Sequence, residues 1–410
     1  MTRVRVVHYN HTGVIAGAER VLLNALPQLR DEGLQSIVLS PAGPLQSEAA
    51  RSGFEVVECY PLEARFTSNP VELAKCMRSF AISIRSLRMK LRCLQPDVVH
   101  ANSVRAGLVA SAATVGMRTG VVWHVHDTLP RHPLSVAIRG FAAMSRRTSL
   151  IAVSRATART FCGRLWKRRL APKTDVLHNI FAGVRVGSTA QQRDRLRGEL
   201  GATGRFLVGC VGQICKRKNQ IAMVGAFAEV LKCSPEALLL IVGSALFPCN
   251  VPYEVSVRQK IEELGISANV LMLGNRDDVP LLLETMDLLV LPSRNEPFPM
   301  ILLEAMSAAT PTVAFAVDGV PELLADRRTA WLVRSGDAVQ LARTILWAKK
   351  HPEQRRRLAS AARVALRKQD TPEIYGKRLA SILLKHAYPV QTSSSTAMVE
   401  SHASQLGETA

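Results

Sequence analysis

The sequence predicts an α/β protein built from two doubly wound parallel sheets, each with helices on both faces. Short apolar runs alternate with helical stretches along most of the 410 residues. This rhythm is typical of parallel sheets, because crossover helices bury both faces of the strands. It breaks once near the middle of the chain and then resumes. A chain of this length suits two domains of ordinary size.

Five strands are expected in the first half, each a short apolar run bounded by polar or turn residues. They are Val4–Tyr9, Ile37–Ser40, Val98–Asn102, Val121–Val125 and Leu150–Val153. Helical stretches separate them, as a βαβ order requires. We therefore predict a first Rossmann-like domain over residues 1–186.

A polar stretch at residues 187–204 interrupts the pattern and predicts a linker. Five more strands follow and define a second Rossmann-like domain over residues 205–371. They are Phe206–Val211, Leu238–Val242, Val270–Leu273, Leu288–Leu291 and Thr312–Phe315. A helix is expected at residues 372–386, and the polar, low-complexity tail at 387–410 predicts disorder.

The composition limits the class of protein. Hydrophobic residues make up 47% of the chain, enough for two cores, while the 5% of aromatic residues disfavours a stacking surface for nucleic acid. No apolar run reaches the roughly 18–20 residues that span a bilayer. The chain opens on a strand pattern rather than a signal peptide. The eight cysteines show no zinc-binding spacing, so we expect reduced thiols in a cytoplasmic protein.

The net charge of +20 is partly concentrated on one predicted helix, at residues 71–94. Leucine, isoleucine, methionine and phenylalanine recur on one face at helical spacing. Another face carries Lys75, Arg78, Arg85, Arg88 and Arg92. Such a helix either covers a core with a solvated outer face or binds an anionic membrane surface. Nucleic acid is the partner that the sequence favours least.

The segment most informative about function follows the expected strand Leu288–Leu291. Glu296 falls in a loop, and Glu304 lies about two turns along the next helix. That helix is predicted from Met300 to Ala309, with Pro299 at its first position, where a missing N–H costs nothing. A helix start behind a strand binds anions, because unpaired amides and the positive dipole end converge there. Two carboxylates beside it suit the hydroxyl-rich sugars of a nucleotide sugar.

This segment resembles the Glu-x7-Glu signature of the family-4 retaining glycosyltransferases of group 1. The resemblance implies the GT-B fold, in which two Rossmann-like domains face each other across a cleft. It also implies that the helix at residues 372–386 crosses back onto the first domain. The resemblance extends over residues 3–385 and is strongest from 207 to 325.

Two loops of the first half support the resemblance, because ligands bind beyond the carboxyl ends of strands in doubly wound sheets. The segment from Ala16 to Val21 resembles a Gly-Gly-Ala-Glu-Arg-Val loop of the family, in which Gly17 lets the backbone approach the donor diphosphate. His126 closes the strand Val121–Val125, and the resemblance implies that it hydrogen-bonds the donor sugar. Strand alternation places His124 on the same face.

The loop that opens the second half, Val211 to Asn219, resembles a family loop whose arginine and lysine grip the departing diphosphate. Lys218 matches the lysine, whereas Gln213 stands where arginine is usual. Either Lys216 or Arg217 supplies the missing charge, or Gln213 suffices as a neutral donor.

By resemblance, Glu304 binds the ribose hydroxyls, and Glu296 contacts the donor sugar and stabilises positive charge developing at its anomeric carbon. The backbone amides of Phe298, Met300 and Ile301 would hold the diphosphate together with the lysine.

Arg276, after the strand Val270–Leu273, either contacts the nucleotide or is a surface arginine. The turn from Asp318 to Glu322 resembles a Gly-Gly-Val-Pro-Glu turn of the family, with a structural role. No Asp-x-Asp metal motif falls at a suitable loop, so we expect neither a metal nor another cofactor. Lys218 and the helix dipole would replace Mg²⁺.

The resemblance implies a retaining, metal-independent transfer of a sugar from a nucleotide-diphosphate sugar to a glycan or lipid-linked acceptor. Bacterial surface polysaccharide biosynthesis is the expected setting, in the cytoplasm or peripherally on the inner face of the cell membrane. Two alternatives stay open: another GT-B enzyme such as a sugar-nucleotide epimerase, and a catalytically degenerate binding protein. The ordered set Gly17, His126, Lys218, Glu296 and Glu304 favours the transferase.

Overall fold

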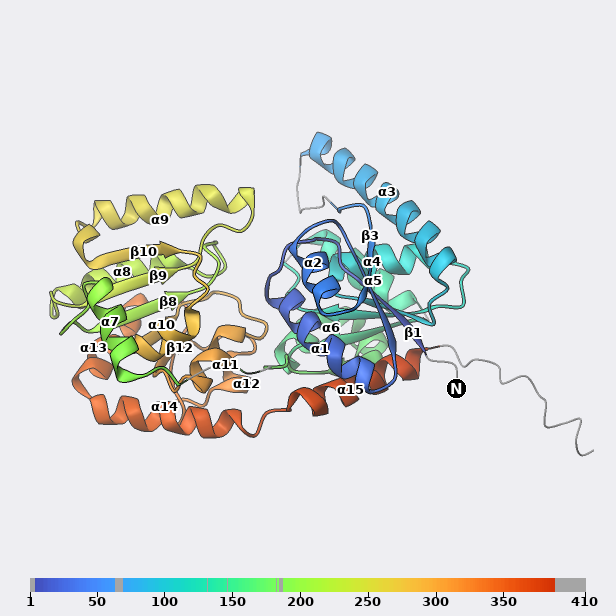
Figure 1. Cartoon of the computed structure of the whole chain (residues 1–410). Coiled ribbons are helices and arrows are strands. Elements are labelled where there is room, and N and C mark those ends of the chain that lie inside the picture. The colour runs from blue at the N-terminus through green and yellow to red at the C-terminus, as the bar shows by residue number, and fades with distance from the viewer. Residues whose placement is uncertain are drawn as a thin grey trace, which may run out of the picture.

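The computed structural model describes residues 4–62, 69–130, 132–145, 147–181, 183 and 187–387. They form two separate parallel sheets with helices on both faces, so the predicted pair of doubly wound domains is confirmed (Figure 1). The strand order is β3-β2-β1-β4-β5-β6-β7 in the first sheet and β10-β9-β8-β11-β12-β13 in the second. The order therefore reverses between β1 and β4, and again between β8 and β11. Ligands bind at such switch points in open α/β sheets.

The strands of the first sheet all pair in parallel. They are β1 (Arg5–Tyr9), β2 (Gln35–Ser40), β3 (Glu55–Glu58), β4 (Val98–Ala101), β5 (Gly120–Val125), β6 (Thr148–Ala152) and β7 (Thr174–Val176). The sequence did not indicate β3 and β7. Both are short edge strands that are only partly buried, so they lack the continuous apolar run of a central strand.

The second sheet is also parallel throughout. Its strands are β8 (Leu207–Val211), β9 (Leu238–Val242), β10 (Val270–Gly274), β11 (Leu288–Leu291), β12 (Thr312–Phe315) and β13 (Trp331–Val333). Five of the six follow the predicted runs to within one residue, and only the short edge strand β13 was missed.

Helices connect successive strands. Those of the first half are α1 (Gly17–Asp31), α2 (Pro44–Arg51), α3 (Pro70–Leu94), α4 (Val104–Ala113), α5 (Pro133–Met144) and α6 (Arg155–Leu170). The second half contains α7 (Ala190–Glu199), α8 (Gln220–Leu231), α9 (Val251–Glu263), α10 (Val279–Thr285), α11 (Met300–Ser307), α12 (Val320–Leu323), α13 (Ala338–Lys350), α14 (Pro352–Leu366) and α15 (Pro372–His386). Short 3₁₀ helices lie at Ala171–Lys173, Pro248–Asn250 and Ser267–Asn269.

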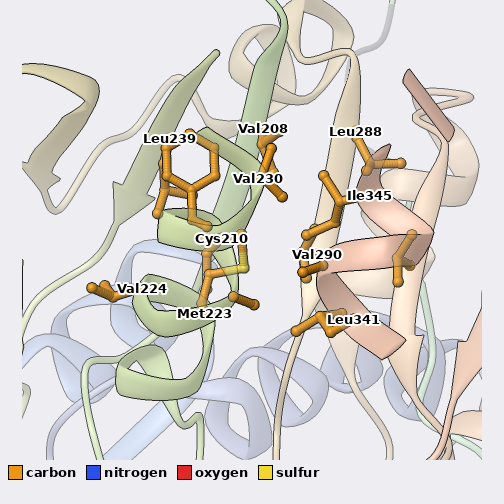
Figure 2. Packing of buried hydrophobic residues seen from close by; sticks show 14 of the residues in the cluster. Val208, Cys210, Met223, Val224, Val230, Leu239, Leu288, Val290, Leu341 and Ile345 are labelled. Carbon is orange, nitrogen blue, oxygen red and sulfur yellow. The ribbon is translucent and has the colours of Figure 1, made fainter. Parts of the chain in front are cut away.

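Each sheet buries both of its faces. In β8, Val208 and Cys210 face one apolar cluster, while Leu207 and Val211 face the other. Figure 2 shows the first of these clusters, where Val208 lies with Val290, Met223 and Leu341 among residues of β11, α8 and α13. This two-sided burial is why the strands are nearly continuous apolar runs in the sequence.

The stretch 187–204 was predicted as a linker, but it contains helix α7. Leu196 on this helix is buried in the core of the second domain. Arg197 donates to the carbonyl of Thr285 and forms an ion pair with Asp287 at 2.9 Å. The helix therefore belongs to the second domain, and the polar composition reflects its exposed face.

The last described helix, α15, lies along α1 of the first domain (Figure 1). Tyr375 and Leu383 share an apolar cluster with Val21 and Leu29. Gly376 permits the close approach, because a Cβ at this position would lie 2.4 Å from Gln28 Cβ. The tail predicted to be disordered lies, from residue 388 on, outside the described residues.

Candidate active site

The predicted site loops lie where the two domains meet. They follow β1 and β5 in the first sheet and β8 and β11 in the second, at the carboxyl ends of the strands. A Cβ at Gly17 would lie 3.9 Å from Met300 Cγ, so the first-domain glycine adjoins the start of α11. Electrostatic interactions also cross between the domains, from Arg20 to Glu304 and from Asp127 to Arg217.

A direct clamp holds this arrangement. The carboxylate of Glu322 accepts hydrogen bonds from the amides of Arg155 at 2.9 Å and Ala156 at 2.8 Å, at the start of α6. Its Oε2 also lies 3.1 Å from His178 Nε2. The His178 ring stacks on Phe298, with 4.9 Å between ring centroids. The turn that was predicted to be structural thus fixes one domain against the other.

Glu296 is the most constrained residue of the site. Its side chain is buried, and its oxygens accept hydrogen bonds from Lys218 Nζ at 2.9 and 3.1 Å and from Arg217 Nη1 at 3.3 Å. Its amide donates to Asp318 Oδ2 at 2.7 Å, and its carbonyl accepts from the amide of Gly319. Burial alone would raise the pKa of Glu296, but the two cations outweigh it and hold that pKa below its usual value.

The loop after β8 presents both cations to Glu296. Gly212 has a φ of 140°, which favours glycine, and a Cβ there would lie 3.5 Å from Lys218 Cε. The carbonyl of Arg217 accepts a hydrogen bond from the amide of Arg294 at 2.9 Å. The loops after β8 and β11 are therefore tied together by main chain as well as by charge.

Glu304 contrasts with Glu296. It is partly exposed, and no described residue donates a hydrogen bond to its carboxylate. Burial raises the pKa of Glu304, while Arg20 and Lys218 act in the opposite direction. An acceptor with two uncommitted oxygens at the interdomain face is suited to a pair of ligand hydroxyls.

The start of α11 departs slightly from the prediction. Pro299 precedes the helix as its N-cap residue, and the helix ends at Ser307 rather than Ala309. The amides of Met300 and Ile301 fall in the first turn, where they have no intrahelical acceptor. The amide of Phe298 lies in the loop just before it, and this side chain is buried.

His126 and His124 share one face of the sheet at the end of β5, as predicted, with 4.0 Å between ring centroids. Burial, followed by the charge of His100, lowers the pKa of His126 to about 3, so its imidazole is neutral near pH 7. His126 Nε2 lies 3.1 Å from Asn102 Oδ1. Asn102 was missed as a site residue, although its place after β4, at the switch point, was the signal that could have identified it.

Among the described residues, Gln213 and Arg276 form no hydrogen bond with Glu296, Glu304 or His126. Gln213 lines a cavity of about 420 Å³ together with Lys216, Arg217 and Tyr253. Arg276 forms a two-bond ion pair with Asp278, at 2.6 and 2.8 Å, near the surface. Among the described residues it contacts no other predicted site residue.

Asp318 was also missed as a site residue. The sequence showed it only as the first position of a resembling turn, where the family has glycine. The structure shows that its carboxylate holds the backbone of Glu296.

Within the described residues, no group of three or more His, Cys, Asp or Glu side chains is placed to hold a metal ion. None of the described helices is both long and apolar enough to cross a bilayer.

Two family models match the chain. The model for glycosyl transferases group 1 matches residues 192–365, and the model for Glycosyltransferase Family 4 matches residues 15–179. The first range covers the strands of the second sheet, and the second range covers the first sheet from α1 onward, without β1.

Curated relatives are similar over parts of the chain. N-acetyl-alpha-D-glucosaminyl L-malate synthase of Bacillus anthracis is 33% identical over 154 residues, which are 38% of this chain and 39% of that protein. A lipopolysaccharide core biosynthesis mannosyltransferase of Rhizobium leguminosarum is 31% identical over 145 residues, 35% of this chain and 41% of that protein. The chain thus aligns with about two fifths of the length of these two relatives.

Solved structures share the complete fold. HepE of Anabaena, in complex with UDP-glucose, has a TM-score of 0.79 at 24% identity, covering 93% of this chain and 100% of that one. WaaG, a glycosyltransferase involved in lipopolysaccharide biosynthesis, has a TM-score of 0.70 at 17% identity, covering 93% and 99%. With a family model on each domain and this common fold, the chain belongs to the family-4, group 1 glycosyltransferases of GT-B fold.

Proposed function

We propose that this protein is a retaining glycosyltransferase that moves a sugar from a nucleotide-diphosphate sugar to a glycan or lipid-linked acceptor without a metal. The observation that carries this proposal is the pairing of Glu296 with two cations, Lys218 and Arg217, beside the uncommitted carboxylate of Glu304. Lys218 and Arg217 place two cations at this point of the site, and cations attract a diphosphate.

Each group then has a role. Lys218, Arg217 and the first amides of α11 hold the diphosphate, and Glu304 accepts from the ribose hydroxyls. As the cations turn to the diphosphate, Glu296 faces the anomeric carbon, where positive charge develops. Because the leaving group is already a good one, positioning and electrostatic stabilisation supply most of the catalysis.

The bond changes follow from this placement. The bond between the anomeric carbon and the phosphate oxygen breaks, and its electron pair stays on the phosphate. The acceptor hydroxyl attacks from the same face, and its proton passes to the leaving phosphate. A covalent intermediate on Glu296 is the alternative route.

The donor and acceptor classes rest on the relatives. One relative is named as a UDP-galactose-dependent transferase acting on a diphosphoundecaprenol-linked sugar, and it is 22% identical over 82% of this chain. Another is named as a GDP-mannose-dependent mannosyltransferase. These names support a nucleotide-sugar donor and a setting in bacterial surface glycan synthesis. Transfer to an acceptor separates this proposal from an epimerase or a degenerate binding protein.

Glu304→Ala is expected to weaken nucleotide binding about 10- to 100-fold, because a hydrogen bond to a charged group contributes roughly 1.5–3 kcal/mol. A thermal-shift panel of UDP, GDP, ADP and their sugars measures this. A ligand at about 100 times its Kd stabilises by roughly 2.7 kcal/mol. Since burial raises the pKa of Glu304, affinity in the wild type falls as the pH is lowered through that raised pKa.

The control for this panel is Glu263→Ala, at the exposed end of α9 and ion-paired with Lys260. It removes a carboxylate of the same domain far from α11 and leaves the nucleotide response unchanged. A wild type without any response at millimolar ligand counts against the transferase. Equal responses in Glu304→Ala and the wild type count against the assigned role of Glu304.

We also propose that the layer of helices α3 to α6 binds an anionic membrane surface. Between residues 70 and 170 the sequence has 18 lysines and arginines but 3 acidic residues. Apolar side chains with more than half of their surface exposed lie among these basic residues, including Met77 (64% exposed), Met144 (64%) and Leu165 (75%). On α3, the predicted apolar face is buried at Leu87 and Leu91 but not at Met77. Basic residues interspersed with exposed apolar ones suit an anionic lipid surface.

Charge reversal at the last turn of α6 tests this surface. The triple variant Lys167→Glu, Arg168→Glu, Arg169→Glu is expected to lose at least tenfold in binding to phosphatidylglycerol vesicles, since each basic residue near such a surface contributes about 1 kcal/mol. Co-sedimentation at low salt measures it, and high salt abolishes the wild-type signal.

The matched control reverses three exposed arginines of α13, α14 and the residue after α14: Arg343, Arg363 and Arg367. It changes the net charge equally and should retain vesicle binding. Equal losses in both triple variants would show that only the net charge matters. No binding by the wild type would remove the membrane proposal and leave the transfer chemistry untouched.

A further inference from the structure

A row of buried histidines crosses the first sheet below the site. His8 Nδ1 lies 2.9 Å from His100 Nδ1, and His100 Nε2 lies 3.2 Å from His124 Nδ1. The far end of the row is closed by Ser36, whose Oγ lies 3.0 Å from His8 Nε2. The other end reaches His126, which contacts His124 through the ring faces rather than through a hydrogen bond.

The row does not decide where the proton of His126 sits. A neutral imidazole has one N–H donor and one acceptor nitrogen. The bonds among His8, His100 and His124 can therefore run in either direction, and both directions end at His124 Nε2, which has no partner among the described residues. His126 takes no part in these bonds, so its tautomer is set from elsewhere.

Asn102 sets it. Its Nδ2 lies 3.3 Å from the main-chain carbonyl of Ala18 and 2.9 Å from Asn10 Oδ1. A main-chain carbonyl can only accept, so the amide nitrogen of Asn102 must face Ala18, and its Oδ1 must face His126 Nε2. An amide oxygen also only accepts. His126 Nε2 therefore carries the hydrogen, and Nδ1 carries the lone pair.

We propose that Asn102 is a positioning residue that holds His126 in the Nε2–H tautomer, so that Nδ1 is a permanent hydrogen-bond acceptor for a hydroxyl of the donor sugar. This deepens the proposed function and rests on it for the identity of the ligand. His126 Nδ1 has no partner among the described residues, and the ring is partly exposed.

The substrate class follows from this tautomer. A fixed acceptor selects a sugar position that bears a hydroxyl able to donate. It disfavours the deoxy, fluoro or carboxylate analogue at that position, because the acceptor would be left unpaired or repelled.

The surroundings of His126 keep it neutral. His100 on β4 and His124 on β5 interact with His126 directly. Glu19 at the start of α1 and Arg217 of the second domain interact with the neighbouring Asp127. Arg217 interacts electrostatically with Asp127 and offsets its charge. With burial as the largest cause, the pKa of His126 is about 3. The imidazole is thus an acceptor over the whole working range of pH.

The test reads the ring nitrogens directly. Long-range ¹⁵N–¹H spectra of protein labelled at histidine distinguish a protonated from an unprotonated ring nitrogen, and a His126→Gln spectrum assigns the signal. In the wild type, His126 is expected to show N–H at Nε2 alone from pH 5 to 8. In Asn102→Ala both tautomers should appear. In Asn102→Asp the carboxylate stabilises the imidazolium, so both nitrogens should carry hydrogen at the acid end.

Ser36→Ala is the control, because it removes a buried hydroxyl from the far end of the histidine row without touching Asn102. It should leave the His126 signals unchanged. Identical His126 signals in the wild type, Asn102→Ala and Asn102→Asp would overturn the proposal. An Nδ1–H signal from His126 in the wild type would also overturn it.

Kinetics provide the second readout. The kcat/KM of sugar transfer in Asn102→Ala is expected to fall about tenfold, the value of one neutral hydrogen bond. In Asn102→Asp the pKa of His126 should be raised, so kcat/KM should fall as the pH is lowered through that pKa. The wild type should show no such fall. If Asn102→Asp shows the imidazolium signal but its kcat/KM does not change with pH, the tautomer assignment stands. The proposed contact between His126 and the donor sugar then fails.

Discussion

Glu296→Gln is expected to lower kcat for sugar transfer by about 10²–10³-fold, or roughly 3–4 kcal/mol, the usual loss of one preorganised electrostatic contact. The amide keeps the shape of the side chain but not the negative charge that opposes the positive charge developing at the anomeric carbon. Nucleotide affinity should be unchanged or higher, because Lys218 and Arg217 lose the carboxylate that they pair with. Steady-state transfer kinetics and nucleotide titration measure the two effects separately.

The control for this variant is Glu229→Gln on α8, whose carboxylate is exposed and paired with Lys232. Both parameters should stay at their wild-type values there. A Glu296→Gln enzyme that loses nucleotide affinity but retains kcat would show that Glu296 binds the ground state and does not stabilise the transition state.

Lys218→Met is expected to lower kcat/KM about 10²-fold and to destabilise the fold as well. The departing diphosphate loses a buried cation, whose side chain is 12% exposed, and Glu296 keeps only the longer contact to Arg217. Removing one partner of a buried ion pair lowers the free energy of unfolding by roughly 3–5 kcal/mol. Because Arg217 still pairs with Glu296, we expect a loss near the lower figure. Transfer kinetics and denaturant unfolding measure the two losses.

The pH dependence of this stability loss follows from Glu296. Its folded-state pKa is depressed, so its ion pairing stabilises the protein above the pKa of an unfolded glutamate. That stabilisation disappears as the pH falls through the folded-state pKa. The difference in unfolding free energy between the wild type and Lys218→Met should therefore be largest near neutral pH and shrink under acid conditions.

Lys216→Met serves as the matched control, since Lys216 is an exposed lysine of the same loop. Its effect should be small in both measurements. The structure places Arg217, and not Lys216, against Glu296, which makes Arg217 the candidate for the charge that Gln213 lacks. A loss in Lys216→Met equal to that in Lys218→Met would contradict this placement.

Most of the fold was predictable because the central strands are buried on both faces. Val208 and Leu207 are both apolar for this reason, although they point to opposite clusters. The strands that the sequence did not reveal, β3, β7 and β13, lie at sheet edges, where partial burial or short length weakens the apolar pattern. Helix α7 was taken for a linker because its packing depends on few residues, chiefly Leu196.

The position of the candidate site in the fold was predictable where a residue type lies at a fixed distance behind a strand. Glu296, Glu304 and Lys218 follow strand ends, and their loops carry recognisable spacing. The contacts between loops carry no such signal. Asp318 holds the backbone of Glu296 from 22 residues away, and Asn102 orients His126 from a different strand.

The sequence alone thus determined the α/β class, the central strands and the chemical groups at the strand ends, because burial and backbone geometry act over short stretches of chain. Only the tertiary structure decided which groups are already paired. It joined Lys218 and Arg217 to Glu296 and left Glu304 without a hydrogen-bond donor among the described residues. It also fixed the tautomer of His126 through Asn102 and Ala18. Hydrogen bonds and ion pairs depend on distances of a few ångströms between segments far apart in sequence, and folding brings those segments together.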